Sequence, residues 1–499
     1  MQPDVHYLPK TSPFPHQATE FQLSKDAKIR AIFWEQQTGK TKVIIDTLCY
    51  NYMKGVLNGM LVVAPNGVHR NWVTDEIPIH MPDPILADCY MHFYQSKRAS
   101  TKWHQKEVNR VCSFKGLSIL TMTYDAFVTK KGKAAVWKFM QNRSMLYVLD
   151  EAHRIKTPSA KRTRSIVLSG KFAGYKRIMT GTPVSCGPFD VYAPMRFLSP
   201  EFWFRFGFRK FVTFRHHFGI YRTGQKRTWQ EDGSEGEPQE FEYVVGYQRL
   251  EQLHDILKPI ASRVTKKTAL PGLPDKVYSK KYFELTPKQR AVYDEFKNEY
   301  IVELDSGQVL SEPLAMVRWL RLHQITSNYV PTDNPEEDEP TVEIDPGNDV
   351  RLDCLLDLLK DIPHQAIIWA RFTLDIDKIM RELKGEAVRY DGHVGDDERA
   401  ANKLAFQKGE AKYFVGNAQA GAEGLSLKMA KSVIYFNNSF KLIERLQSED
   451  RAHGIGTTSQ VGYIDIIAED TVDLRIVKNL VKKVEISDII LGDDAKDWL

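Results

Sequence analysis

Short apolar runs recur along the first part of the chain, and a longer polar or helical stretch follows each of them. The runs are residues 31–34, 60–64, 117–121, 145–149 and 177–179. They show no alternation of apolar and polar positions, which indicates strands buried on both faces. Strands of this kind, alternating with helix-length segments, predict a parallel sheet covered by helices on both sides.

A second set of apolar runs with the same rhythm occupies the last third of the chain. These runs are residues 366–369, 387–390, 413–416, 432–436 and 461–467. Each set supplies enough strands for its own sheet, and a chain of 499 residues with 42% apolar residues is long enough for two cores. The pattern therefore predicts an α/β fold with two parallel-sheet lobes in tandem.

The segment between the two sets has a different character. Aromatic and basic residues crowd positions 202–218, a glycine- and charge-rich stretch follows at 223–240, and helical patterns dominate from 250 to 329. Residues 332–348 contain almost no apolar side chain and much negative charge, which predicts a solvated linker.

Domain boundaries follow from this change of pattern. We expect the first lobe at residues 1–262, with a helical protrusion from about residue 200. The second lobe is expected at residues 263–499, with a helical protrusion to about residue 330 and the acidic linker at 332–348. Both boundaries are predictions from composition alone.

Composition narrows the class of protein only a little. The net charge of +5 suits a nucleic-acid partner without requiring one. The five cysteines are widely spaced and form no CxxC pair, which favours reduced core thiols over a disulfide or zinc framework. The first residues lack a secretory signal pattern, and no apolar run is long enough to cross a bilayer. We therefore expect a soluble, cytoplasmic protein.

A candidate phosphate-binding turn follows the first apolar run, in the sequence WEQQTGKT at residues 34–41. Backbone amides at a strand-to-helix turn bind phosphate, so Lys40 would contact the β and γ oxygens and the Thr41 hydroxyl would bind Mg²⁺. The match is incomplete, because Trp34 stands where the full phosphate-binding loop has glycine. An ordinary surface turn is the alternative at this point.

Two carboxylates follow the apolar run at residues 145–149, in the sequence MLYVLDEAH. Open α/β sheets bind ligands at the carboxyl ends of their strands. Asp150 is therefore placed to bind Mg²⁺, and Glu151 to position and deprotonate the attacking water. Acidic residues also end strands as helix caps, which is the alternative. A third turn, RIMTGTPV at residues 177–184, follows the next run and also fits a plain tight turn.

The order of these motifs resembles that of superfamily-2 helicases, and their amino-acid sequences resemble those of the Snf2 family. DEAHRIKTPSAK, RIMTGTPV, LVVAPNGVHRNWVTDEI and ILTMTYDAF resemble Snf2 motifs II, III, Ia and Ib. RYDGHVGDDERAANKLAFQKG, NAQAGAEGLSL and QSEDRAHGIG resemble the stretches leading to motifs V and VI. LHDILKPIASRVTKK and ELTPKQRAVYDEF resemble the Snf2 helical protrusions and linker. The resemblance spans residues 14–490 and implies two RecA-like lobes with Snf2-type helical insertions, in a helicase-like ATPase.

The resemblance also implies roles for individual residues. Gln17 would recognise adenine, and Arg451, oriented by Gln447 and Asp450, would stabilise the charge on the transferring phosphoryl group. Small residues that would couple the nucleotide state to lobe movement are Gly181, Thr182, Gly421 and Gly424. The ATP-binding set is then Gln17, Thr38, Gly39, Lys40, Thr41, Asp150, Glu151, Gln447 and Arg451, with Thr41 and Asp150 as the Mg²⁺ ligands.

The sequence departs from the family pattern at two places that bear on the rate of ATP hydrolysis. The family has a second arginine three residues after the first one of motif VI, and here that position is Gly454. If the second arginine normally stabilises the transition state, we expect either that this protein hydrolyses ATP slowly or that Arg445 takes the place of the second arginine. The phosphate-binding turn is also poor in glycine, so it is expected to close only around bound nucleotide.

Motor helicases grip the sugar-phosphate backbone and read little sequence. The resemblance nominates Asn66, Arg70, Asn71, Thr123, Tyr124 and Gln419 as DNA contacts. Basic clusters at residues 161–164, 205–210 and 266–267 could extend this track, although each also fits a solvated face. The expected binding is indifferent to sequence and steeply dependent on salt.

The resemblance therefore implies a monomeric ATP-dependent translocase on duplex, forked or branched DNA, using ATP and Mg²⁺. Two alternatives stay open, namely an ATP-gated nucleic-acid clamp that barely hydrolyses, as Gly454 suggests, and an RNA helicase. No accessory domain flanks the expected lobes, so we expect a minimal bacterial or viral type that remodels DNA structures or DNA-bound proteins. Its expected location is then the nucleoid or a viral replication compartment.

Overall fold

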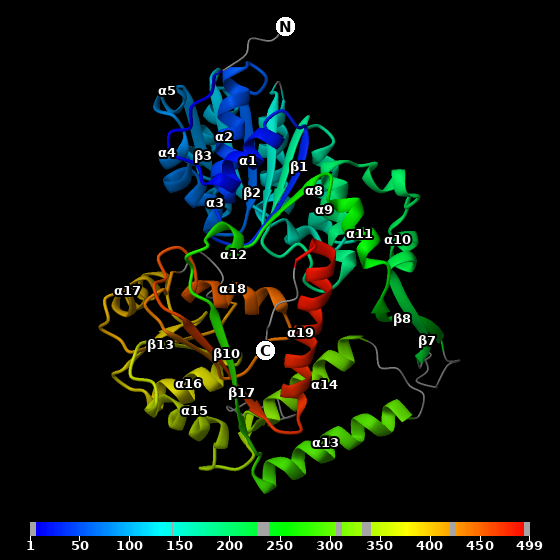
Figure 1. Ribbon diagram of the computed structural model, residues 1–499, viewed down its shortest axis with the longest axis vertical. Helices are drawn as coiled ribbons and strands as arrows, with labels where there is room; N and C mark the ends of the chain where they lie inside the picture. Colours follow the sequence, from blue (N-terminus) through cyan, green and yellow to red (C-terminus); the bar gives the residue numbers. More distant parts are fainter. Residues whose placement is uncertain are drawn as a thin grey trace. The chain divides into compact units, whose positions relative to one another are not determined.

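The computed structural model describes residues 6–141, 143–226, 239–305, 312–331, 341–419 and 426–493 (Figure 1). Contacts divide the chain into two compact units. Unit 1 consists of the residues up to Phe218, the segment Arg249–Leu273 and a short segment that begins at Ile486. Unit 2 consists of Gly219–Gln248 and Pro274–Glu485.

Unit 1 is built on a parallel sheet with the strand order β3-β4-β2-β5-β6-β1-β9. Its strands are β1 (Ile29–Trp34), β2 (Gly59–Ala64), β3 (Cys89–Phe93), β4 (Leu117–Thr123), β5 (Met145–Asp150), β6 (Tyr175–Met179) and β9 (Ala261–Val264). Every residue of β2 and β5 is buried, as the unbroken apolar runs predict.

Helices of unit 1 connect the parallel strands. They are α1 (Pro15–Ser24), α2 (Lys40–Met53), α3 (Val68–Asn71), α4 (Ile77–His80), α5 (Asp83–Ala87), α6 (Lys102–Ser113), α7 (Lys130–Met140), α8 (Lys161–Gly170), α9 (Tyr192–Leu198), α10 (Phe211–Phe218), α11 (Leu250–Leu257) and α12 (Lys266–Ala269). One face of the sheet packs against α2, whose Ile44 and Leu48 share a core with Ile32 and Val62. This packing fixes the turn between β1 and α2, where the glycine-lysine motif lies.

Unit 2 has its own parallel sheet, with the order β10-β17-β16-β13-β15-β14. Its strands are β10 (Lys276–Phe283), β13 (Ala366–Trp369), β14 (Ala387–Tyr390), β15 (Tyr413–Gly416), β16 (Ser432–Tyr435) and β17 (Val461–Ala468), and Figure 1 shows β10 beside β17. Side chains of β13 alternate between two cores, because Ile368 joins one and Ile367 and Trp369 join the other. The strand is therefore buried on both faces.

The remaining elements of the chain are helices and two antiparallel ribbons. The helices are α13 (Pro287–Asp305), α14 (Glu312–Ile325), α15 (Val350–Lys360), α16 (Thr373–Glu382), α17 (Asp396–Gln407), α18 (Leu442–Ala452) and α19 (Val472–Leu491). The ribbons pair β7 (Gly219–Lys226) with β8 (Gln239–Tyr247), and β11 (Tyr329–Pro331) with β12 (Thr341–Glu343). Among the described helices, none combines the length and apolar character that a membrane span requires.

The fold class is confirmed, since two parallel-sheet α/β units are present. The boundary at residue 262 differs from the structure, because it would cut β9, which pairs with β1, and unit 1 continues to Leu273. The linker expected at 332–348 includes the paired strand β12, while residues 332–340 lie outside the described part. All five cysteines are free thiols, but Cys186 is exposed and is not the core residue that was expected.

Arg351 holds unit 2 together from α15, and its loss should unfold this unit more easily. Its buried guanidinium donates to the Thr326 and Phe436 carbonyls and pairs with the buried carboxylate of Asp473. Arg351→Met should lower the free energy of unfolding of unit 2 by about 3–5 kcal/mol, since a buried carboxylate loses its partner. Urea denaturation measures this; the exposed Arg381→Met is the control, and a loss equal to the control would contradict the prediction.

Candidate nucleotide site

The turn between β1 and α2 has the backbone of a phosphate-binding loop. Gly39 precedes the first residue of α2 with φ of +80°, and Gln37 is also left-handed with φ of +63°. A Cβ atom at Gly39 would lie 2.1 Å from Nε2 of Gln17, so any other residue would collide there. Gly39 is therefore required both by its backbone conformation and by the close approach of α1.

The side chain of Lys40 is hydrogen-bonded to the backbone of this loop. Its Nζ donates to the carbonyl oxygens of Trp34 and Glu35, at 3.0 and 2.9 Å. The hydroxyl of Thr38 also donates to the Glu35 carbonyl, at 2.7 Å. The lysine thus rests on the backbone of its own loop, and a bound triphosphate would have to compete with two carbonyl groups for it.

Helix α1 contacts the loop through two side chains. Gln17 is 3% exposed, and its Nε2 donates to the Gly39 carbonyl at 3.0 Å. His16 Nε2 lies 2.8 Å from the Thr38 carbonyl, and its ring meets the Trp34 ring edge-on at 5.0 Å. The structure therefore brings the predicted Gln17 to the phosphate-binding loop, together with a histidine that the motifs did not single out.

Asp150 ends β5 and is fixed by two aromatic side chains. The Trp72 indole donates to its carboxylate at 3.0 Å, and the Tyr124 hydroxyl donates to its carbonyl at 2.7 Å. Burial, followed by the negative charge of Glu151, raises the pKa of the Asp150 carboxyl to about 7. A cation beside this carboxyl would favour its charged form.

Glu151 has more polar partners than its neighbour. Thr180 donates to it at 2.9 Å, His153 Nδ1 lies 3.2 Å away, and Gln36 donates to its other oxygen at 3.3 Å. Burial favours the neutral form, but His153, Lys40 and Thr180 outweigh it and lower the pKa of Glu151 to about 2. Glu151 is therefore charged at neutral pH, as a group that orients and deprotonates water needs to be.

The sheet register brings these groups to one edge. Ile32 of β1 and Asp150 of β5 both pair with Met179 of the intervening strand β6, so both strands end beside one another. Lys40 is close enough to lower the pKa values of both carboxyls. Lys40, Asp150 and Glu151 therefore form one cluster, as the sequence predicts.

Carboxylate and hydroxyl oxygens suit Mg²⁺, which is bound in such sites by one or two carboxylates together with phosphates and water. Asp150 and Thr41 at the start of α2 provide these donor types. Within the described residues, no group of three or more histidine, cysteine or acidic side chains could hold a metal alone.

Three residues predicted for motif VI lie together on α18 of unit 2. Gln447, Asp450 and Arg451 are all buried in this helix, and Lys276 approaches Asp450 at 3.5 Å. Gly454 follows the helix, and its N–H donates to the Thr457 hydroxyl at 3.0 Å.

Arg445 does not fit the substitute role suggested for it. Its guanidinium is 2% exposed and engaged by Asp465, Glu449 and Asn438 inside unit 2. Moving it to a phosphate would leave the buried carboxylate of Asp465 without its cation, at a cost of about 3–5 kcal/mol. Arg445 is a core residue, and the earlier expectation is corrected.

The predicted coupling residues are only partly described. The Thr182 N–H donates to the Thr180 hydroxyl at 3.1 Å, and a Cβ at Gly181 would lie 3.2 Å from the Gln36 side chain. Both therefore adjoin side chains that contact Glu151. Gly421 and Gly424 lie outside the described residues.

The predicted DNA contacts fall into two groups. The side chains of Asn66, Arg70, Asn71 and Gln419 are exposed, and Thr123 is half-buried. Tyr124 is 1% exposed and its hydroxyl binds the Asp150 carbonyl, so it supports the nucleotide site and is not available to DNA. Lys266 is also buried, and its N–H donates to Glu35, so it does not extend a basic surface.

Four contacts to the site were not predicted. Thr180 and His153 lie inside the quoted TGTP and DEAH strings, so their motif positions were the available signal. His16 reaches the site from α1, and Trp72 reaches it from the first residue of the π-helix that follows α3. Trp72 lies inside the quoted motif Ia string, whereas no quoted motif contains His16.

Two known families match successive parts of the chain. Residues 26–328 match the family described as SNF2-related domain, and residues 350–456 match the helicase conserved C-terminal domain. The transcription regulatory protein SNF2 of Saccharomyces cerevisiae is 25% identical over 91% of this chain and 26% of the yeast protein. The ISWI chromatin-remodeling complex ATPase CHR17 of Arabidopsis thaliana is 25% identical over 92% of this chain and 40% of its own length. The chain thus spans well under half of these relatives.

A solved structure is also among the matches. It is the Sulfolobus solfataricus SWI2/SNF2 ATPase core in complex with dsDNA, with 22% identity and a TM-score of 0.41. The match covers 98% of this chain and 95% of that chain.

Trp72 should act as a positioning residue for Asp150. Trp72→Phe removes the hydrogen bond to the carboxylate, which is worth about 1.5–3 kcal/mol for a charged acceptor. The Mg²⁺ concentration for half-maximal ATPase activity should therefore rise about tenfold or more. Trp103→Phe, at a 52% exposed tryptophan, is the control. An unchanged Mg²⁺ requirement in Trp72→Phe would show that the hydrogen bond does not position Asp150.

Proposed function

This chain belongs to the SNF2-related family of helicase-like ATPases, and on that premise we propose that it is an ATP-driven translocase on double-stranded DNA. The observation that supports this most directly is the cluster of Lys40, Asp150 and the charged Glu151 at one sheet edge. A site that only held nucleotide would have no need of a buried, ionised base beside it.

The side chains of unit 1 divide the chemistry of hydrolysis between them. Lys40 leaves its two carbonyl partners and neutralises the phosphate oxygens, while Gln17 stays beside the loop and recognises adenine. Glu151, held by Thr180 and His153, orients the attacking water and accepts its proton. Mg²⁺, held by Asp150 and Thr41, supplies positive charge to the phosphates when bound.

Arg451 of α18 would provide the second positively charged side chain at the phosphates, after Lys40. Charge spreads over the oxygens of a transferring phosphoryl group, and an arginine there is worth about 10³ to 10⁵ in rate in related enzymes. Gln447 and Asp450, which are buried on the same helix, would orient Arg451. Cycles of ATP binding and hydrolysis would then alternate the grip of the two units on the DNA backbone.

The proposed substrate is duplex, forked or branched DNA, bound with little regard to sequence, and proteins on that DNA are further candidate targets. Exposed Asn66, Arg70, Asn71 and Gln419 support backbone contacts. The protein is proposed to act as a monomer within the cell, and a minimal bacterial or viral type stays part of the proposal.

An ATP-gated clamp is the second candidate, and two observations favour it. Gly454 replaces an arginine of the family pattern, and Arg445 is committed to the core of unit 2. A clamp would close on DNA with ATP but release phosphate slowly. An RNA helicase is the third reading, and the TGTP string and the helical insertions argue against it.

The motor proposal predicts that duplex DNA stimulates phosphate release and that Glu151→Gln abolishes it. Removing the base should lower the DNA-stimulated rate by about 10² or more, while ATP binding persists because Lys40 and Asp150 are intact. Steady-state phosphate release with duplex DNA, single-stranded DNA and RNA of equal length measures this.

A matched set of outcomes separates the candidates. If wild type and Glu151→Gln release phosphate equally slowly while ATP tightens DNA binding, the protein is a clamp. If RNA stimulates more strongly than duplex DNA, the choice of nucleic acid is wrong.

A further inference from the structure

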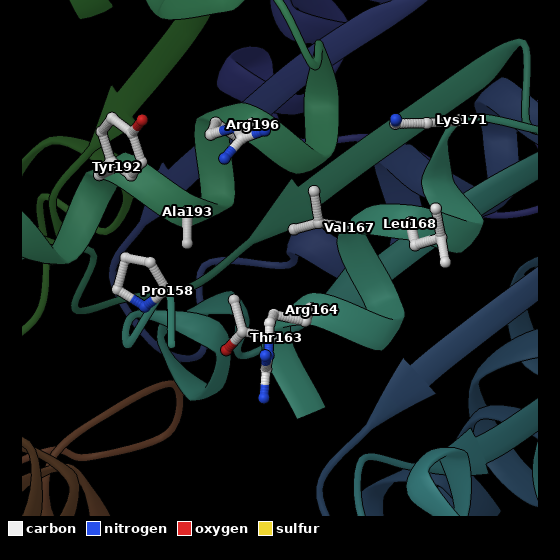
Figure 2. Close-up of a pocket in the computed structure, with 9 residues that line it drawn as sticks. All are labelled: Pro158, Thr163, Arg164, Val167, Leu168, Lys171, Tyr192, Ala193 and Arg196. Carbon is white, nitrogen blue, oxygen red and sulfur yellow. The ribbon is translucent and has the colours of Figure 1, made fainter. Parts of the chain in front are cut away.

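A cavity of about 200 Å³ opens between α8 and α9 in unit 1, and Figure 2 shows its lining. It is lined by Pro158, Thr163, Arg164, Val167, Leu168, Lys171, Tyr192, Ala193 and Arg196. None of these residues belongs to the phosphate-binding loop, to the catalytic carboxylates or to the DNA contacts nominated from the motifs, and only Arg164 belongs to the basic cluster 161–164 that could extend the DNA track. The cavity is therefore separate from the site assigned above.

Positive charge dominates this lining. Arg164, Lys171 and Arg196 form no ion pair with a carboxylate among the described residues, whereas the nearby Arg162 is paired with Asp125 at 3.2 Å. The Arg196 Nε is buried and makes no hydrogen bond within the described part of the chain, and the Arg196 guanidinium lies 6.0 Å from the centroid of the Tyr192 ring. The cavity therefore offers cationic groups that no carboxylate of the described residues pairs with.

Acidic residues are missing from the sequences of the two helices that line the cavity, α8 and α9, and from the neighbouring helix α7. Helix α7 is KKGKAAVWKFM, α8 is KRTRSIVLSG and α9 is YAPMRFL. The helices at this surface thus carry positive charge alone, and its complement must be negatively charged.

Exposed apolar side chains accompany the charge. Leu168 is 53% exposed and lines the cavity, and Phe172, next to Lys171, is 64% exposed. Phe172 meets Trp137 of α7 edge-on, with ring centroids 4.9 Å apart. Apolar groups of this size gathered beside cations are typical of protein interfaces, which are enriched in aromatic residues and arginine.

Duplex DNA would complement the charged residues of this surface but not its apolar residues. Phosphates would pair with Arg164 and Lys171, but the backbone of a duplex has no apolar group to cover Leu168 and Phe172. A polypeptide that carries both acidic and apolar side chains covers both. Its apolar side chain fits a cavity of this volume, and its carboxylates meet the guanidinium groups in paired hydrogen bonds.

We propose that the α8–α9 surface, formed by Arg164, Leu168, Lys171, Phe172 and Arg196, docks an acidic segment of a partner protein that inserts an apolar side chain into the cavity. The partner is defined by this chemistry, namely aspartate or glutamate interleaved with leucine or phenylalanine. The docking does not depend on ATP hydrolysis, so it stands or falls separately from the proposed translocation.

A labelled synthetic peptide of alternating glutamate and leucine or phenylalanine tests the proposal on the full-length protein, by fluorescence anisotropy. Wild type should bind it at least about tenfold more tightly than a peptide of equal charge with serine at the apolar positions. The double variant Arg164→Glu/Lys171→Glu should weaken binding about tenfold or more, because two attractive contacts become repulsive. Phe172→Ser, which keeps the charge, should weaken binding of the apolar peptide alone.

Controls on the same preparation decide between occupants. Arg381→Glu/Lys384→Glu, exposed in unit 2, changes the net charge equally and should leave binding unchanged. DNA-stimulated ATPase of the single variant Lys171→Glu should stay within about twofold of wild type, since Lys171 lies outside the assigned DNA contacts and outside the basic cluster 161–164. Unchanged peptide binding in the double variant overturns the proposal. Displacement of the peptide by duplex DNA, with loss of DNA stimulation in Lys171→Glu, assigns the surface to nucleic acid.

Discussion

Two adjacent carboxyl groups are buried at the end of β5, and the surrounding site compensates the cost of their charge. Burying an ionised carboxylate without partners is strongly unfavourable. His153, Lys40 and Thr180 outweigh the burial of Glu151, so its pKa falls to about 2, whereas burial and the charge of Glu151 raise the pKa of Asp150 to about 7. One carboxylate is therefore ready to activate water, and the other reaches its charged form most easily beside a cation.

Strand position explains which elements the sequence predicts. Interior strands such as β2 and β5 are buried on both faces, so their composition alone marks them. The parallel-sheet strands that were missed, β3, β9 and β10, all lie at sheet edges, where side chains are less deeply buried and polar residues are tolerated. The ASRV sequence of β9 has only two apolar residues, which is why the lobe boundary was placed inside it.

The nucleotide site was predictable only where its residues are contiguous in sequence. Lys40, Asp150 and Glu151 stand in short strings whose chemistry is legible without a structure. Trp72 and His16 reach the same site through the fold, because Trp72 stands in a string that suggested DNA contacts and no quoted motif contains His16. Tyr124 illustrates the converse, since a motif position suggested DNA while the tertiary structure buries its hydroxyl beneath Asp150.

The two departures from the family pattern act on different steps of the cycle. In the phosphate-binding turn, Gly39 and Gln37 already have the left-handed backbone that the turn needs. Nucleotide binding therefore chiefly requires Lys40 to exchange its two carbonyl partners for phosphate oxygens. A cost there weakens affinity. The missing arginine at Gly454 concerns charge that develops during phosphoryl transfer, so a cost there lowers turnover and leaves affinity unchanged. Slow hydrolysis with tight ATP binding would therefore trace to Gly454, and weak binding with normal turnover to the loop.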